Sequence, residues 1–248
     1  MAWKTPKTDW APPDSVRDSD LNRIEGNILE LSKSIASSLV TFYVGPGGNN
    51  ENDGLTPSTR FATIAKAVQS IPRNLNGKYC YIMLSEGTYA EDIVLQGGFN
   101  GTVILSCSTY GGTVSAQHLS ISDGACVELA NMVLAVTRGV SVDKGGSLIA
   151  TGYGATIRNT GYANALSIKN NSVASIANLN FGASSIFGID AGFNSRVHVD
   201  AISGTASGYA ISATTGSIVS YGVNSATGIV FTSNGGRVLT GSQGTGGL

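Results

Sequence analysis

Three stretches near the C-terminus share the pattern that decides the fold: NSRVHV at 194–199, GSIVSY at 216–221 and GGRVLT at 235–240. Each begins with Gly or Asn, which tolerate positive φ, and continues with alternating side chains. Earlier stretches repeat the pattern at about 22 residues, the period of a solenoid coil. Turns are therefore expected to begin at Gly124, Gly145 or Gly146, Asn171, Asn194, Gly216 and Gly235.

Aligning these turns predicts columns of interior and exterior residues. The first interior column lies three residues past each turn: Val127, Ile149, Ala174, Val197, Val219 and Val238. The second lies five past: Leu129, Thr151, Ile176, Val199, Tyr221 and Thr240. Between them are the residues expected to face outward: Glu128, Ala150, Ser175, His198, Ser220 and Leu239. A further apolar column precedes the turns: Leu119, Val140, Leu166, Ile189, Ile211 and Val230.

The repeats predict an all-β fold, a right-handed parallel β-helix, over residues 97–248. Each coil would bond to the next at the strand spacing of about 4.8 Å, with like residues stacked in the interior. This region contains no proline and 26 of the 33 glycines of the chain. Because one coil alone has no core, the stack needs caps at its ends.

Residues 41–96 are predicted to form the entry to this β-helix. A capping helix is expected at about 62–71, ending at Pro72, because four apolar residues share one helical face: Ile64, Ala67, Val68 and Ile71. The Asn-Asp-Gly at 52–54 lacks the further acidic ligands of a calcium loop, so we expect a tight turn there.

Residues 1–40 form a third region, which carries 11 of the chain's charged residues. Trp3 and Trp10 lie among Lys, Pro and Asp, a composition that cannot bury a core and indicates an extended arm needing a partner surface. Candidate N-caps at 18–20 introduce a helix. Its apolar residues recur at spacings of three and four: Leu21, Ile24, Ile28, Leu31 and Ile35.

This narrow apolar seam has two interpretations. It suits an amphipathic helix lying on its own protein, or a short parallel coiled coil, for which the mixed Ile/Leu seam allows a trimer. We favour the trimer, because side-by-side association would also cover a weakly charged β-helix that is otherwise at risk of edge aggregation.

Composition excludes several classes of function. The net charge of −1 argues against a nucleic-acid partner. No apolar run is long enough to span a bilayer or to form a secretory signal, so export by lysis is expected. The three cysteines, Cys80, Cys107 and Cys126, are expected to be small buried side chains, with no metal site and no cofactor.

A catalytic centre is not expected either. A glycosidase needs two carboxylates about 5–10 Å apart, and the least implausible pair is Asp190 and Asp200, with Arg196 between them. We interpret these as solvated charges. His118 and His198 are interpreted as lone histidines without a Ser or Asp companion. Two further residues, Asn131 and Asn178, are candidates for an internal amide ladder.

Two compound motifs resemble known proteins. WKTPKTDW at 3–10 followed by DSDLNRIEGNI at 18–28 resembles the N-terminal segment of tail and baseplate-associated proteins of phages of Gram-positive bacteria and of phage-tail-like particles. FYVGPGGNNENDG at 42–54 and RFATIAKAV at 60–68 resemble the entry and cap of pectin-lyase-like β-helices, which are common in phage tail spikes and fibres.

The resemblance implies a homotrimer attached to a virion or a phage-tail-like particle, assembled in the bacterial cytoplasm and released by lysis. The arm would dock to a tail or baseplate protein through residues 1–35, including these residues: Trp3, Trp10, Asp20, Asn22, Arg23 and Ile24. The β-helix would project toward the host surface, with a host glycan as a further partner. The alternative is a depolymerase of cell-surface polysaccharide, a tailspike-type glycosidase or lyase.

Overall fold

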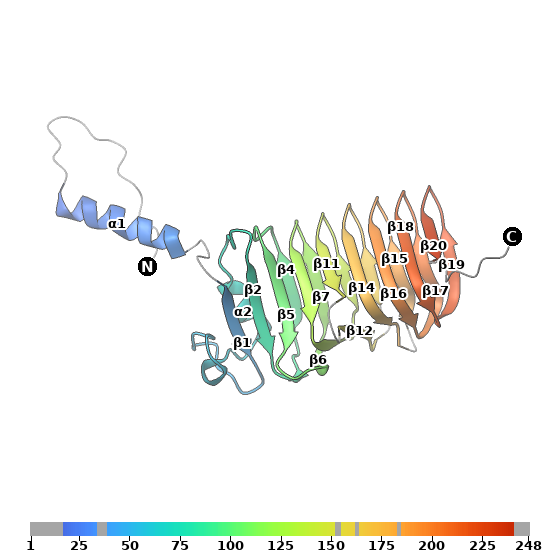
Figure 1. Ribbon diagram of the computed structural model, residues 1–248, viewed down its shortest axis with the longest axis horizontal. Coiled ribbons are helices and arrows are strands. Elements are labelled where there is room, and N and C mark those ends of the chain that lie inside the picture. The colour runs from blue at the N-terminus through green and yellow to red at the C-terminus, as the bar shows by residue number, and fades with distance from the viewer. Residues whose placement is uncertain (1–16, 34–38, 152–154, 162–163, 183–184, 241–248) are drawn as a thin grey trace, which may run out of the picture.

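The chain folds into a parallel β-helix, as the repeats predict (Figure 1). The computed structural model describes residues 17–33, 39–151, 155–161, 164–182 and 185–240. All described strand pairs are parallel and form about seven coils, whose strands are arranged in three lines along the axis.

The first line carries the central ladder. Its strands, in order along the axis, are β1 (Val40–Val44), β2 (Tyr79–Leu84), β5 (Thr102–Cys107), β8 (Cys126–Ala130), β11 (Ser147–Ala150), the first parts of β14 (Val173–Asn180), β16 (Arg196–Ser203) and β18 (Ile218–Asn224), and β20 (Arg237–Thr240).

The other two lines complete each coil. The second consists of β3 (Gly87–Thr88), β6 (Gly112–Ala116), β9 (Met132–Val136), β12 (Thr156–Asn159) and the second parts of β14, β16 and β18. The third is a separate sheet of β4 (Asp92–Gln96), β7 (His118–Ser122), β10 (Val140–Val142), β13 (Leu166–Ile168), β15 (Ser185–Ala191), β17 (Thr205–Ala213) and β19 (Thr227–Thr232).

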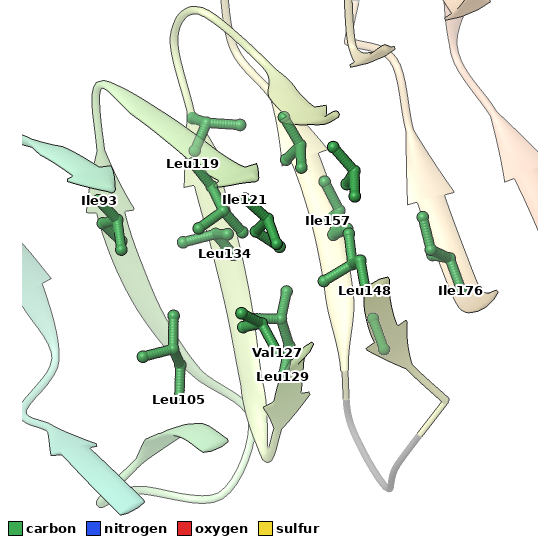
Figure 2. Close-up of a cluster of buried hydrophobic side chains, with 14 of the residues drawn as sticks. Ile93, Leu105, Leu119, Ile121, Val127, Leu129, Leu134, Leu148, Ile157 and Ile176 are labelled. Carbon is green, nitrogen blue, oxygen red and sulfur yellow. The ribbon is translucent and has the colours of Figure 1, made fainter. Parts of the chain in front are cut away.

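Like residues stack above like in the interior. The apolar column predicted before the turns is in register throughout, from Leu119 on β7 to Val230 on β19. Its first five members are buried, and Val230 in the last coil is exposed. Figure 2 shows the side chains of neighbouring coils, including Leu105, Val127 and Leu148, gathered in this core.

One coil departs from the predicted columns. Ile149 and Thr151 were expected inside and Ala150 outside, but Leu148 aligns with Val127 and Ala174 and is fully buried. Ile149 instead pairs with Glu128 and is half-buried. The turn begins at Gly145 and not at Gly146, and a slip of one residue moves every side chain to the other face of the strand.

The corners explain why the turn residues recur. Six corners of the first line, those before β8 to β20, have two consecutive residues with positive φ: Asp123–Gly124, Lys144–Gly145, Asn170–Asn171, Phe193–Asn194, Thr215–Gly216 and Asn234–Gly235. Gly, Asn and Asp adopt this left-handed conformation most readily. The interior residue of the first line follows three positions after the second corner residue in every case.

Helix α2 (Ile64–Ser70) closes the N-terminal end, as predicted (Figure 1). Ile64 and Ala67 are fully buried against the first coils. The Thr63 hydroxyl accepts a hydrogen bond from the Lys66 N–H and caps the helix. The carboxylate of Glu91 also accepts from the first helical N–H groups, at 2.8 and 3.0 Å.

The Asn-Asp-Gly stretch is a tight turn, as predicted. Asp53 accepts hydrogen bonds from the Leu55 N–H (3.0 Å) and the Thr59 hydroxyl (2.6 Å), and Gly54 has φ of +69°. Thr59 belongs to a short 3-10 helix, η1 (Pro57–Thr59). The hydroxyl bond to Thr59 lowers the pKa of the Asp53 carboxyl, followed by the bond from Leu55.

Candidate functional site

Helix α1 (Asp18–Lys33) carries the described part of the predicted attachment region. It begins one residue after Arg17, and Asp20 is its third residue. The Asp20 carboxylate accepts a hydrogen bond from the Arg17 N–H at 3.2 Å and pairs with Arg23 at 3.5 Å. A carboxylate in the first turn satisfies a free N–H and favours the helix dipole.

The apolar seam of α1 is uncovered. Leu21, Ile24 and Ile28 are 50%, 44% and 60% exposed. Figure 1 shows the ribbon of α1 apart from the β-helix, and none of these three residues belongs to the buried core of the described residues. Asn22 is also exposed. Leu31 lies within the helix, but its side chain, together with Ile35, Trp3 and Trp10, falls outside the described residues.

The two histidines are not lone, contrary to the sequence interpretation. His198 on β16 faces outward as predicted, but its Nδ1 lies 2.9 Å from the Ser220 hydroxyl on β18. Its Nε2 lies 2.9 Å from the Asp200 carboxylate. The serine belongs to the next coil, 22 residues along the chain. A search for motif spacing misses such companions because the coil period brings them together.

His118 on β7 makes the same kind of contact. Its Nε2 lies 2.9 Å from the hydroxyl of Ser141 on β10, and its Nδ1 lies 3.1 Å from the Arg138 carbonyl oxygen. The Arg138 guanidinium in turn pairs with Asp92 and donates to Gln117 at 3.1 Å. This cluster connects three successive coils on the third line.

The Asp200–His198–Ser220 arrangement has the connectivity of a nucleophilic triad. Acyl transfer also needs donors placed for an oxyanion in a site that excludes water. Ser220 lies inside β18, between β16 and β20, where parallel ladders engage the backbone N–H groups. Asp200 and His198 are well exposed. We therefore interpret both histidine clusters as surface hydrogen-bond networks that tie successive coils together.

The candidate glycosidase pair is divided between two sheets. Asp190 lies on β15 of the third line and pairs with Lys169 at 3.1 Å. Asp200 lies on β16 and bonds to His198. Arg196 is exposed on the first line. The predicted amide ladder is wrong: Asn178 is exposed and pairs with Thr156, which pairs with Val133 and not with Asn131.

A shallow groove of about 250 Å³ crosses the third line between β7 and β13. Serines from three successive coils, Ser120, Ser141 and Ser167, lie in register along it. Lys144, which pairs with Asp123 at 3.7 Å, and Lys169 lie at its side. The side-chain bonds from Gln96 and Ser122, followed by the lysine, lower the pKa of Asp123.

The C-terminal part of the third line carries an aromatic patch, defined by Phe187, Tyr209, Ile229 and Phe231. The Phe187 and Tyr209 rings stack with centroids 5.7 Å apart, and the Tyr209 and Phe231 rings lie 5.0 Å apart. Ile229 is aligned with Tyr209 and is 63% exposed, and Phe231 is 39% exposed. The sequence carried a signal for this patch, because Phe187, Tyr209 and Phe231 recur at intervals of 22 residues, but the predicted columns did not include these positions.

Within the described ranges, no group of three His, Cys, Asp or Glu side chains is placed to hold a metal ion. Cys80 and Cys107 are buried free thiols, whereas Cys126 is partly exposed, contrary to prediction. Among the same residues, no helix is long and apolar enough to cross a bilayer.

Comparison with known proteins gives no identification: no family model, no curated protein and no solved structure matches the chain.

Proposed function

We propose that the chain is a structural and adhesion protein of a phage or phage-tail-like particle. Its N-terminal region docks to a tail or baseplate protein, three copies associate through α1, and the β-helix projects toward the host surface. The resemblance of the segments at 3–10 and 18–28 supports the particle assignment.

The observation that carries the proposal is the uncovered seam of α1. Three large aliphatic side chains, Leu21, Ile24 and Ile28, face solvent at the spacing of coiled-coil core positions. Exposed apolar stripes of this kind mark interaction surfaces. In a parallel trimer each of these side chains packs against its copies, and all three β-helices leave the coiled coil in the same direction.

The β-helix suits the role of a rigid projection. Every described strand pair is part of a continuous ladder, and about seven coils at about 4.8 Å each give a rod of roughly 34 Å. The groove between β7 and β13 presents serine hydroxyl groups beside Lys144 and Lys169, each of which is paired with an aspartate. Such a surface suits weak contact with a host glycan. The net charge of −1 offers no attraction for nucleic acid.

Light scattering of the purified full chain tests the trimer. We expect a mass three times that of the 25.4-kDa chain. Ile28→Asp should yield monomers, because three carboxylates would meet in the seam. Leu29→Asp is the matched control, since Leu29 is adjacent, similarly exposed at 54% and one position off the seam. A monomeric native chain, or equal effects of both variants, would contradict the proposal.

A second assay addresses the depolymerase alternative. Purified protein is incubated with bacterial cell-wall glycan, and the release of reducing ends or the formation of halos is measured. We expect neither. Release that disappears in Asp190→Asn or Asp200→Asn would replace the structural role with a catalytic one.

A further inference from the structure

The strongest unexplained feature is the aromatic patch, which the described residues of its own chain leave open. Ile229 and Phe231 project outward from the last described strand of the third line. Tyr209 and Phe187 continue the patch down two coils through ring contacts. Large apolar side chains grouped on one strip of the surface are typical of protein contacts.

The last two strands of this line lie in a stretch without charge, whereas Phe187 lies on β15, which also carries Asp190. Strands β17 and β19, at 205–213 and 227–232, contain no charged residue. The earlier coils of the same line carry charged side chains held in pairs: Asp92–Arg138, Asp123–Lys144 and Lys169–Asp190. Charged pairs therefore extend as far as β15, and the coils of β17 and β19 contain none.

We propose that the aromatic patch is the surface through which the β-helices of three copies of this chain contact one another around the trimer axis. The inference rests on the trimer of the proposed function and adds to it which face of the β-helix turns inward. The first line, with the His198 cluster, would then face solvent.

Symmetry favours a second copy as the occupant of this patch. Near a rotation axis, each residue meets the same residue of its neighbours. A charged column placed there would oppose like charges, whereas aromatic and aliphatic side chains pack favourably against their own copies. Among the described strands of the third line, β17 and β19 combine neutrality with large apolar side chains.

Chemical crosslinking of the full chain tests the orientation. Ile229→Cys places a thiol at the patch, and Val173→Cys on β14, a β-branched residue 45% exposed on the first line, is the matched control. Both variants carry Cys126→Ser, because Cys126 is the partly exposed native thiol, whereas Cys80 and Cys107 are buried. A three-armed maleimide reagent is added over a range of protein concentrations, and products are separated by denaturing electrophoresis.

We expect covalent trimers from Ile229→Cys in a yield independent of protein concentration, because thiols within one assembly have a high effective concentration. Val173→Cys should give only monomers and collision products that increase with concentration. Light scattering is run on the same samples. A trimeric mass without preferential crosslinking at position 229 would overturn the orientation alone, whereas a monomeric mass would overturn the trimer as well.

Discussion

Replacing Leu148 and Ile149 separately by alanine tests the register of the β-helix. Leu148 is fully buried between Val127 and Ala174 of the neighbouring coils. Ladders on both sides hold the backbone of β11, so the site cannot collapse around the missing atoms. We expect Leu148→Ala to lower the free energy of unfolding by about 3–5 kcal/mol. Ile149→Ala removes a similar volume from a half-buried outward position and should cost about 1 kcal/mol or less.

Urea unfolding followed by far-ultraviolet circular dichroism measures the difference. All samples are compared at one protein concentration, because association stabilises the folded state. Hydrogen exchange of β11 and β14 is measured in parallel, since repeat arrays can unfold in parts. If Ile149→Ala lowers the free energy of unfolding as much as Leu148→Ala or more, the observed register is refuted. The alternative alignment, in which the turn begins at Gly146 and Ile149 faces the interior, would then hold.

Three further predictions concern the corners, the cap and pH. Gly139→Ala should prevent soluble expression, because a Cβ there would lie 1.8 Å from the Asn164 carbonyl oxygen. Gly124→Ala is the control, because Gly124 has a similar positive φ but open space around it. This control should lower the free energy of unfolding by only about 1–2 kcal/mol, as measured by thermal melting. Glu91→Ala should destabilise α2 by about 1–3 kcal/mol through loss of two charge-assisted bonds, seen as faster hydrogen exchange at Ile64 and Ala65 while β16 stays protected. Burial raises the pKa of Cys80 from 9.0 to about 12, and chiefly burial raises the pKa of Tyr89 from 10.0 to about 12. The unfolded chain therefore ionises first, so stability should be full below pH 9 and fall as pH rises toward 12. Thermal melts from pH 8 to pH 11 should show this slope, and Cys80→Ala with Tyr89→Phe should flatten it.

The repeat could be predicted from the sequence because the corners impose a strong chemical requirement. The second positive-φ position of each of the six corners is Gly or Asn, so the turn residues recur visibly, whereas the first position also holds Lys144, Phe193 and Thr215. Where both candidate residues are glycine, as at Gly145 and Gly146, composition cannot decide which one is left-handed. Leu148 and Ile149 follow these glycines and are both apolar, so hydrophobicity did not show which of the two faces the interior.

The surface clusters could not be predicted in the same way. His198 meets Ser220, and His118 meets Ser141, only because successive coils are in register. Those contacts depend on the length of each coil, which varies along the chain. The seam of α1 was visible because helical periodicity is local, and its exposure agrees with a partner outside the chain.

Coil length varies without disturbing the stack. Successive interior residues of the first line, from Val127 to Val238, are separated by 19 to 26 residues. The step from corner to interior residue stays constant, so the variation falls elsewhere, as in the longer stretch between β11 and β12 than between β8 and β9. The segments between the lines can therefore differ in length and sequence while the paired strands keep their register. The rod is thus a natural display scaffold, on which peptides could be inserted coil by coil without redesigning its core.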